Sequence, residues 1–397
     1  MRWVMAKMAT NRDFLKDINQ YRGCLIGFAA GDALGYPVET MTEAQISRVY
    51  GAHGITRYHF KGGVAQISAS TQMMLFTATG LLNGATRGII CGIQGAYEGY
   101  TRCCYQDWLK TQILAFAQLQ DGQYHYSWLI DVPEMFNVRS PGKTCVCALI
   151  DSQPGSLQPA INTSKGCGGM LPIAPIGLYR EASLRSDVLL DTIGAKTAEL
   201  THGHELGCIP AAAFVHIIDK ITHEGMGIGQ AVDDAITAIP ELFPECRHMG
   251  EFRAIMSRAV ALAAAHHADE DDLAAIHTLG SGWVAEETLA IAVYCALRYP
   301  DDFQKAVHAA VNHSGNSNAT GAVTGSIVGA SVGFSGIPRT FVDDLELRQV
   351  ILTVADDLYH DCPEALVKSQ YEPMTDKQAV WWETKYFGNT LHPQFRQ

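Results

Sequence analysis

The stretch His313–Pro338, HSGNSNATGAVTGSIVGASVGFSGIP, contains the pattern that decides the fold. A polar loop opens it, and small residues with a glycine at every fourth position follow. Glycines four residues apart lie on nearly one face of an α-helix. Such a ridge lowers helix propensity by roughly 1 kcal/mol per residue, and close approach of neighbouring backbone is the expected compensation. The stretch therefore predicts a tightly packed core helix that begins just after the polar loop.

A second stretch near the N-terminus repeats this spacing. Residues 23–39, GCLIGFAAGDALGYPVE, also have a glycine at every fourth position. We expect this segment to form a core helix too, and we look for function in the polar residues at the ends of the two helices. The two series are Gly23, Gly27, Gly31 and Gly35, and Gly321, Gly325, Gly329 and Gly333.

The remainder of the chain has the pattern of an all-α protein. Apolar residues recur at three- and four-residue spacing in alanine-rich segments such as EFRAIMSRAVALAAAHHA and AEETLAIAVYCALRY, and alternating strand patterns are scarce. The segment 120–169 is instead rich in Gly, Pro, Ser and Asn. It predicts a long loop region with one short helix near 143–149, which favours a binding surface. We predict one mostly α-helical domain without a linker.

Composition narrows the class of protein. The 397 residues are 47% hydrophobic and 18% charged, which is typical of a globular domain. A net charge of −12 disfavours binding to nucleic acid or anionic membranes. The 11 cysteines form no CxxC or zinc-type spacing, which predicts free thiols in a reducing cytoplasm. The uncharged stretch 314–338 is too rich in glycine for a membrane span, and no export signal begins the chain, so we expect a cytoplasmic protein.

Six segments, in the same order, resemble the ADP-ribosylglycohydrolase family, from about Tyr21 to Pro338. The resemblance implies a single-domain, orthogonal multi-helix all-α bundle with two Mg²⁺ or Mn²⁺ ions at the base of a cleft. It also implies hydrolysis of the bond between ribose C1″ of ADP-ribose and an arginine, serine or other acceptor. The segments are GCLIGFAAGDALGYPVE (23–39), SASTQMMLFTATGLL (68–82), SKGCGGMLPIAPIGL (164–178), ELTHGHELG (199–207), LGSGWVAEETLAIAVYCAL (279–297) and the opening stretch (313–338).

The resemblance also gives the expected domain limits. The family-like domain covers residues 21–364. An N-terminal extension, 1–20, precedes it. A C-terminal extension, 365–397, carries several aromatic residues and is expected to pack on the domain.

The positions that depart from the family pattern are those of its metal ligands. The family's Asp-Asp pair corresponds to Ala69 and Ser70, and its two loop aspartates correspond to Asn316 and Asn318. Of the matched carboxylates, Glu39 remains. Mg²⁺ favours charged oxygen ligands, and two divalent ions close together need nearby negative charge. We therefore predict no metal centre and no cofactor, with one weakly bound Mg²⁺ as the alternative.

The ligand-binding positions that the resemblance implies match the family pattern more closely than the metal-ligand positions do. Trp283 is expected to stack on a ribose or adenine, although it could instead pin its loop to the core. His202 matches a histidine that faces the ligand, or it is a core residue. Backbone N–H groups of the glycine-rich loop and the asparagine amides are candidates for holding a diphosphate. The predicted ligand-binding residues are Ser70, Gly166, Cys167, Gly168, Gly169, His202, Trp283, Asn316, Ser317 and Asn318.

Glu39 is the candidate catalytic residue. Glycosidic bonds can be cut by two carboxylates acting as acid and base or nucleophile. For the second carboxylate, Asp32 is assigned a structural role, and Glu286 and Glu287 suit the first turn of a helix equally well. Cys167 is a nucleophile candidate without an identifiable histidine partner.

Three functions stay open, in this order. The first is a protein that binds ADP-ribose, a related nucleotide or glycoside, or an ADP-ribosylated substrate, with hydrolysis weak or lost. The second is an active hydrolase with a remodelled metal-independent or single-metal site around Glu39. The third is a non-catalytic scaffold or regulatory subunit.

Overall fold

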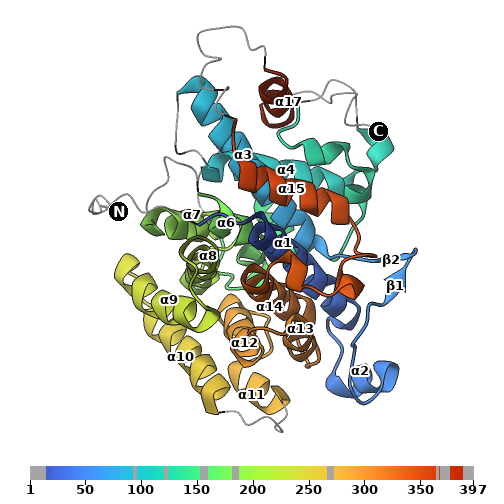
Figure 1. Ribbon diagram of the computed structural model, residues 1–397, viewed down its shortest axis with the longest axis vertical. Helices are drawn as coiled ribbons and strands as arrows, with labels where there is room; N and C mark the ends of the chain where they lie inside the picture. Colours follow the sequence, from blue (N-terminus) through green and yellow to red (C-terminus); the bar gives the residue numbers. More distant parts are fainter. Residues whose placement is uncertain are drawn as a thin grey trace.

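The computed structural model describes residues 15–92, 95, 97–119, 124–152, 160–180, 187–265, 272–363, 366 and 376–387, and α-helices dominate them (Figure 1). The prediction of an all-α fold is confirmed. The strands of the described part, β1 (Phe60–Lys61) and β2 (Val64–Ala65), form one antiparallel hairpin in which Phe60 lies opposite Ala65. The α-helices are α1 (Ile18–Gly35), α2 (Glu43–Tyr50), α3 (Ala69–Cys91), α4 (Tyr97–Ile113), α5 (Lys143–Asp151), α6 (Ala174–Leu178), α7 (Asp187–Glu199), α8 (Glu205–Glu224), α9 (Ile228–Leu242), α10 (Met249–Ala265), α11 (Asp272–Leu279), α12 (Ala285–Arg298), α13 (Phe303–Val311), α14 (Ser317–Val332), α15 (Arg348–His360) and α17 (Lys377–Tyr386).

Helices α1 and α14 lie side by side in the middle of the molecule (Figure 1). Their glycine ridges face each other, and a Cβ atom on Gly27 would lie 2.1 Å from the carbonyl oxygen of Gly325. A Cβ atom on Gly31 would lie 1.9 Å from the carbonyl oxygen of Gly321. No side chain fits at such distances, so the backbones touch, as the four-residue spacing predicts. Both helices are buried on nearly all sides, as expected of helices in a core.

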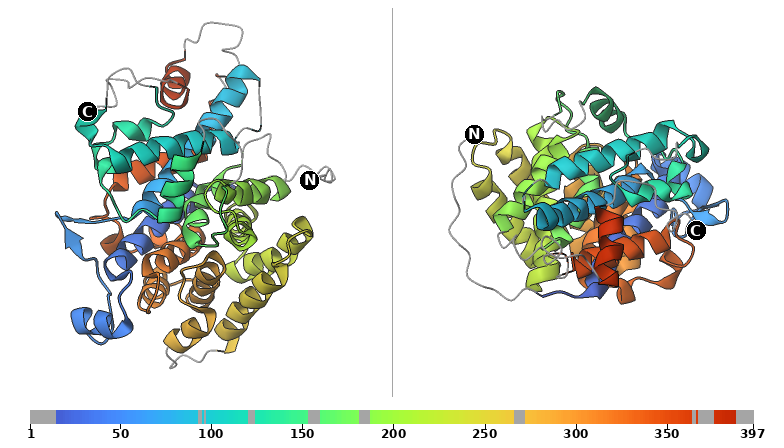
Figure 2. Two further views of the ribbon diagram at one scale, coloured as in Figure 1. Left: turned by 180° about the vertical axis from the view of Figure 1, so that it is seen from behind. Right: turned by 90° about the horizontal axis from the view of Figure 1, so that it is seen from above.

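The other helices surround this pair in layers (Figures 1 and 2). Helices α12 and α13 pack on α14, and α15 packs on α1. Helix α4 lies along α3, and α8 packs against α7 and α9. None of the helices in the described residues is both long and apolar enough to cross a membrane.

Because α1 and α14 run antiparallel, the end of α1 lies beside the start of α14. The last glycine of α1, Gly35, lies against the start of α14, where a Cβ atom on it would be 2.4 Å from the carbonyl oxygen of Ser317. The start of α3 joins them, because the amide of Ser68 donates to Asp32 near the end of α1. Three helix ends therefore meet at one place, where Glu39, Ser70 and the segment 316–318 lie.

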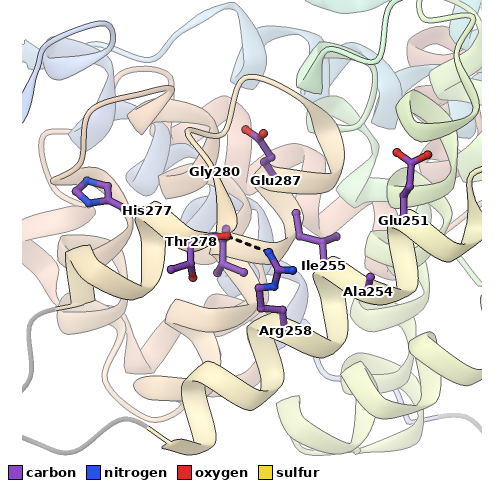
Figure 3. A pocket seen from close by; sticks show the side chains of 9 residues that line it. Glu251, Ala254, Ile255, Arg258, His277, Thr278, Gly280 and Glu287 are labelled. Atoms are coloured by element: carbon purple, nitrogen blue, oxygen red, sulfur yellow. Dashed lines mark hydrogen bonds between the residues drawn. The ribbon is translucent and has the colours of Figure 1, made fainter.

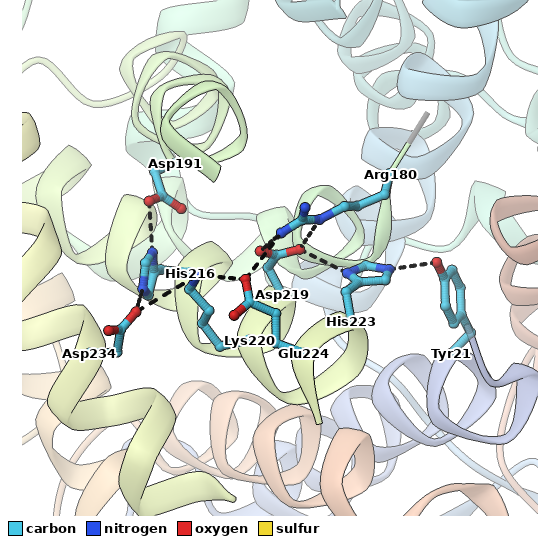
Figure 4. A network of polar contacts seen from close by, with 9 residues as sticks. All are labelled: Tyr21, Arg180, Asp191, His216, Asp219, Lys220, His223, Glu224 and Asp234. Atoms are coloured by element: carbon cyan, nitrogen blue, oxygen red, sulfur yellow. Dashed lines mark hydrogen bonds and ion pairs between the residues drawn. The ribbon is translucent and has the colours of Figure 1, made fainter. Parts of the chain in front are cut away.

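A buried polar network holds α8 to its neighbours away from that place (Figure 4). The two ring nitrogens of His216 each lie 2.8 Å from a carboxylate, one on Asp191 of α7 and one on Asp234 of α9. Further along α8, His223 lies between Asp219 and the hydroxyl of Tyr21 on α1. These contacts fix the helix that follows His202.

Helix α17 packs against α3 and α15. The indole nitrogen of Trp382 donates to the hydroxyl of Thr86, at 2.9 Å. Lys385 forms a buried ion pair with Asp357 and lies 4.6 Å from the ring centroid of Trp128. Of the two predicted extensions, residues 1–14, 365, 367–375 and 388–397 lie outside the described part of the chain. All eleven cysteines lie within the described residues and are free thiols, as the cysteine spacing predicts.

Candidate functional site

Asp32 is the hydrogen-bonding centre of the site. It is completely buried in the last turns of α1. Its Oδ2 atom accepts from the amide of Ser68 at 2.8 Å and from the hydroxyl of Thr71 at 2.5 Å. Its Oδ1 atom accepts from Nδ2 of Asn318 at 3.4 Å. Burial raises the pKa of Asp32 and these donors lower it, with burial prevailing. The carboxylate thus links α1, α3 and α14.

The sequence did not identify this centre. Asp32 was assigned a structural role, and Ser68 and Thr71 were not singled out. The available signal was one acid inside the otherwise apolar segment GFAAGDALG, because an acid buried in a helix core requires polar partners from elsewhere.

The two asparagines of the loop turn their amide nitrogens into the protein. Nδ2 of Asn318 also donates to the hydroxyl of Ser68 at 3.2 Å, and Nδ2 of Asn316 donates to Sγ of Cys167 at 3.2 Å. Both Oδ1 atoms are buried and meet no hydrogen-bond donor among the described residues. Nδ2 of Asn318 therefore donates to two groups of the protein, and the role of these amides toward a diphosphate stays a prediction. The unpaired atoms are acceptors.

Glu39 follows α1 and is partly exposed. Burial, and secondarily the charge of Asp32, raises its pKa to about 7. The charge of Glu39 also acts on Cys167, so Glu39 lies near the glycine-rich loop as well as near Asp32. A carboxyl group that titrates near neutral pH can serve as a general acid or base. The neighbouring carboxyl group is that of Asp32, for which the sequence predicts a structural role.

The two predicted serines differ in orientation. Ser70 stands in the first turn of α3, is partly exposed, and its amide donates to the hydroxyl of Ser68. Ser317 is buried, and its hydroxyl donates to the carbonyl oxygen of His313. The structure therefore brings Ser70 to the site, and it turns the side chain of Ser317 toward its own helix.

The glycine-rich loop wraps around the ring of His202. A Cβ atom on Gly169 would lie 2.8 Å from Nδ1 of this ring. Cβ atoms on Gly166 and Gly168 would lie 3.3 Å from its Nε2 and Cε1 atoms, respectively. Nδ1 is 2.9 Å from the hydroxyl of Thr201, and burial lowers the pKa of His202 to about 4. The ring is neutral at pH 7, so it supports the loop without supplying a positive charge.

Trp283 lies on a second loop that is paired with the glycine-rich loop. Its carbonyl oxygen accepts from the amide of Cys167 at 3.2 Å, and Gly166 forms a β-bridge with Val284. The Trp283 side chain is 44% exposed. Its ring is therefore accessible for stacking while its backbone fixes the loop.

The other catalytic candidates lie in unsuitable surroundings. Burial raises the pKa of Cys167 to about 12, so its thiol is protonated at neutral pH and is a poor nucleophile. Glu286 pairs with Lys165, and Glu287 accepts backbone N–H groups of its own loop. Both glutamates therefore make contacts that hold loops in place.

The two Mg²⁺ ions that the resemblance implies do not fit this donor set. Its carboxylates are those of Asp32 and Glu39, and the remaining oxygens belong to amides and hydroxyls. An N–H donor from Asn318 faces Asp32, where a cation would need an oxygen ligand. Across the part of the chain that the structure describes, no group of three or more His, Cys, Asp or Glu residues is placed to hold a metal ion.

Comparison with known proteins identifies the family. Among curated protein sequences, none matches this one. A solved structure titled "ADP-ribosylglycohydrolase-related protein complex" shares the fold, with a TM-score of 0.56 and 21% identity over 86% of this chain and 98% of that chain. The family model described as ADP-ribosylglycohydrolase matches residues 14–366, which include the whole candidate site. The chain therefore belongs to the ADP-ribosylglycohydrolase family.

Proposed function

We propose that this protein binds ADP-ribose, or a related nucleotide or glycoside, without a binuclear Mg²⁺ centre, and that its hydrolytic activity is weak or lost. Membership of the family supports the class of ligand. The observation that carries the rest is the hydrogen bond from Asn318 to Asp32. It places a neutral N–H donor against the buried carboxyl group of Asp32, which supports a site that holds no cation there.

The unpaired acceptors indicate which part of such a ligand the site suits. The Oδ1 atoms of Asn316 and Asn318 are buried acceptors, and a buried acceptor without a donor costs about 1–3 kcal/mol. The carboxyl group of Glu39 adds a third acceptor nearby. Sugar hydroxyls are donors, so a ribose satisfies these atoms better than a phosphate does. The exposed ring of Trp283 then suits a base or the face of a sugar.

Calorimetry with ADP-ribose, in Mg²⁺ and in EDTA, tests this proposal. We expect the same dissociation constant within about twofold in both buffers, because no ligand contact passes through a metal. The Trp283→Ala variant should bind roughly tenfold more weakly, since stacking on one aromatic ring contributes about 1–3 kcal/mol. Trp381→Ala is the matched control, because Trp381 is 40% exposed and lies on α17. Absence of binding in both buffers, or binding only with Mg²⁺, overturns the proposal.

A second candidate is a hydrolase centred on Glu39. The pKa of about 7 favours it, because such a group can exchange a proton with a leaving group near neutral pH. Turnover of an ADP-ribosylated peptide in EDTA tests it. Activity that disappears in Glu39→Gln and changes near pH 7 supports the candidate, whereas unchanged turnover in this variant rejects it.

A further inference from the structure

An exposed groove of about 400 Å³ is lined in part by Thr278, Gly280 and Glu287, at the start of the loop that leads to α12 (Figure 3). Helix α10 supplies Glu251 and Arg258 to its lining, and α11 supplies His277. Glu287, from the first turns of α12, lines it too and points to the loop beside Gly280. Neither proposed function gives this carboxylate a role.

Glu287 fastens the loop by two backbone hydrogen bonds. Its Oε2 atom accepts from the amide of Ser281 at 3.0 Å and from that of Gly282 at 3.1 Å. Gly280 makes room for this contact, because a Cβ atom there would lie 2.3 Å from Cδ of Glu287. Gly280 also has φ = +126°, which favours glycine. Hydrogen bonds to an ionised carboxylate are among the stronger ones, so they determine where this loop lies.

The same loop touches both halves of the candidate site. The carbonyl oxygen of Ser281 accepts from the amide of Asn316 at 2.8 Å. The carbonyl oxygen of Trp283 accepts from the amide of Cys167 at 3.2 Å. A shift of the loop therefore displaces the asparagine loop, the glycine-rich loop and the stacking ring together.

We infer that Glu287 is a positioning residue for ligand binding, which acts through the loop 280–284 on Asn316, Cys167 and Trp283. This inference rests on the proposed function. Its neighbour Glu286 has a separate contact, an ion pair with Lys165. The groove side of Glu287 is open, so the side chain can be changed without filling a packed core.

The first test measures ADP-ribose affinity and thermal stability of three variants. Glu287→Ala removes the acceptor, and we expect roughly tenfold weaker binding well below the melting temperature, because small displacements of binding groups weaken binding strongly. Glu287→Gln keeps an acceptor oxygen and should bind within about threefold of the unaltered protein. Glu251→Ala removes a carboxylate from the same groove, away from the loop, and should bind normally. A lower melting temperature with unchanged affinity in Glu287→Ala overturns the inference.

The second test needs no ligand. Hydrogen exchange in Glu287→Ala should quicken in segments 280–284, 165–169 and 314–319, and Glu251→Ala should leave all three unchanged. Faster exchange confined to 280–284 overturns the inference, since the loop would then not hold its neighbours. If the unaltered protein fails to bind ADP-ribose, the proposed function is rejected, and the exchange result alone decides the role of Glu287.

Discussion

Asn318 carries an NH₂ group where an aspartate would carry a second carboxylate oxygen. That group donates to Asp32 and to Ser68, so it joins α14 to α1 and α3. An aspartate at this position would place two buried carboxylates against each other, and one of them would have to stay protonated or meet a cation. The amide at this residue therefore avoids a buried pair of carboxylates.

The Asn318→Asp variant should lose about 2–4 kcal/mol of stability at pH 7, because it removes a donor and buries an unpaired charge. Mg²⁺ should restore part of this loss, since a cation can then sit between the carboxylates. Chemical denaturation with and without Mg²⁺ measures both effects. Asn83→Asp is the matched control: Asn83 is also buried, its Nδ2 donates to the carbonyl oxygen of Tyr126, and no Mg²⁺ response is expected. Equal responses of the two variants would contradict the argument.

Glu39 predicts a pH dependence of stability. Its pKa is about 7 in the folded protein and ordinarily 4.5, so the folded state holds the proton more tightly. The stability gained from this proton is complete below pH 4.5 and is lost as the pH rises through 7. The Glu39→Gln variant cannot ionise, so its stability should not fall in this way. The free energy of unfolding of the variant, relative to that of the unaltered protein, should therefore be higher at pH 8 than at pH 5. Urea unfolding at both pH values measures this, and an equal difference at both would show that Glu39 titrates normally.

Sequence reasoning found part of this site. The order of the motifs placed Glu39, Asn316 and Asn318 together. It could not find the role of Asp32, because the donors to that carboxylate come from Ser68 and Asn318, which are 36 and 286 residues away in the chain. The amide orientation of Asn318 likewise depends on these distant partners.

At the scale of elements, the contact between α1 and α14 is what the sequence predicts best. Glycines at every fourth position predicted helices in close backbone contact, and the two ridges meet each other. The spacing did not tell which helix packs on which, because each ridge alone is compatible with any partner backbone. The role of Glu287 was also out of reach, since it depends on the path of the loop before α12.

Gly27→Ala should destabilise the protein by at least about 3 kcal/mol or prevent folding, because the new methyl group would lie 2.1 Å from the carbonyl oxygen of Gly325. Gly250→Ala, near the start of α10, is the matched control, since nothing lies within 4 Å of its Cβ position. That variant should be unchanged or up to about 1 kcal/mol more stable. Thermal melts of both measure the contrast, and equal melting temperatures would show that α1 and α14 can move apart at little cost.

At the scale of the whole molecule, α17 is an integral part of the structure. Lys385 neutralises Asp357 in a buried place, and Tyr386 donates to the same carboxylate at 2.5 Å. Trp382 packs at the far end of α3 from the candidate site and bonds Thr86. These contacts indicate that α17 packs on its own domain, and they argue against a helix that binds another protein.

Truncation before Asp376 should therefore lower the melting temperature and cause association, because it leaves Asp357 without its cation and uncovers the apolar surface beneath Trp382. Light scattering and thermal melts measure these effects. Truncation after Phe387 keeps α17 and is the control that should behave like the full chain. If the protein truncated before Asp376 stays a stable monomer, the result would favour the scaffold function, in which α17 binds another protein.

The contact between α1 and α14 has a consequence for how such a site can change its chemistry. The separation of the two helices is set by main-chain atoms, from Gly23 against Gly329 to Gly35 against Ser317. The hydrogen bond from Asn318 to Asp32 crosses this contact, but the glycine backbones limit how close the two helices can come. Positions 32 and 318 therefore keep their relative placement whichever residues occupy them. An amide can therefore replace an acid at such a position without a change in the spacing of the helices. The same helix framework can then hold either a metal-dependent or a metal-free set of groups.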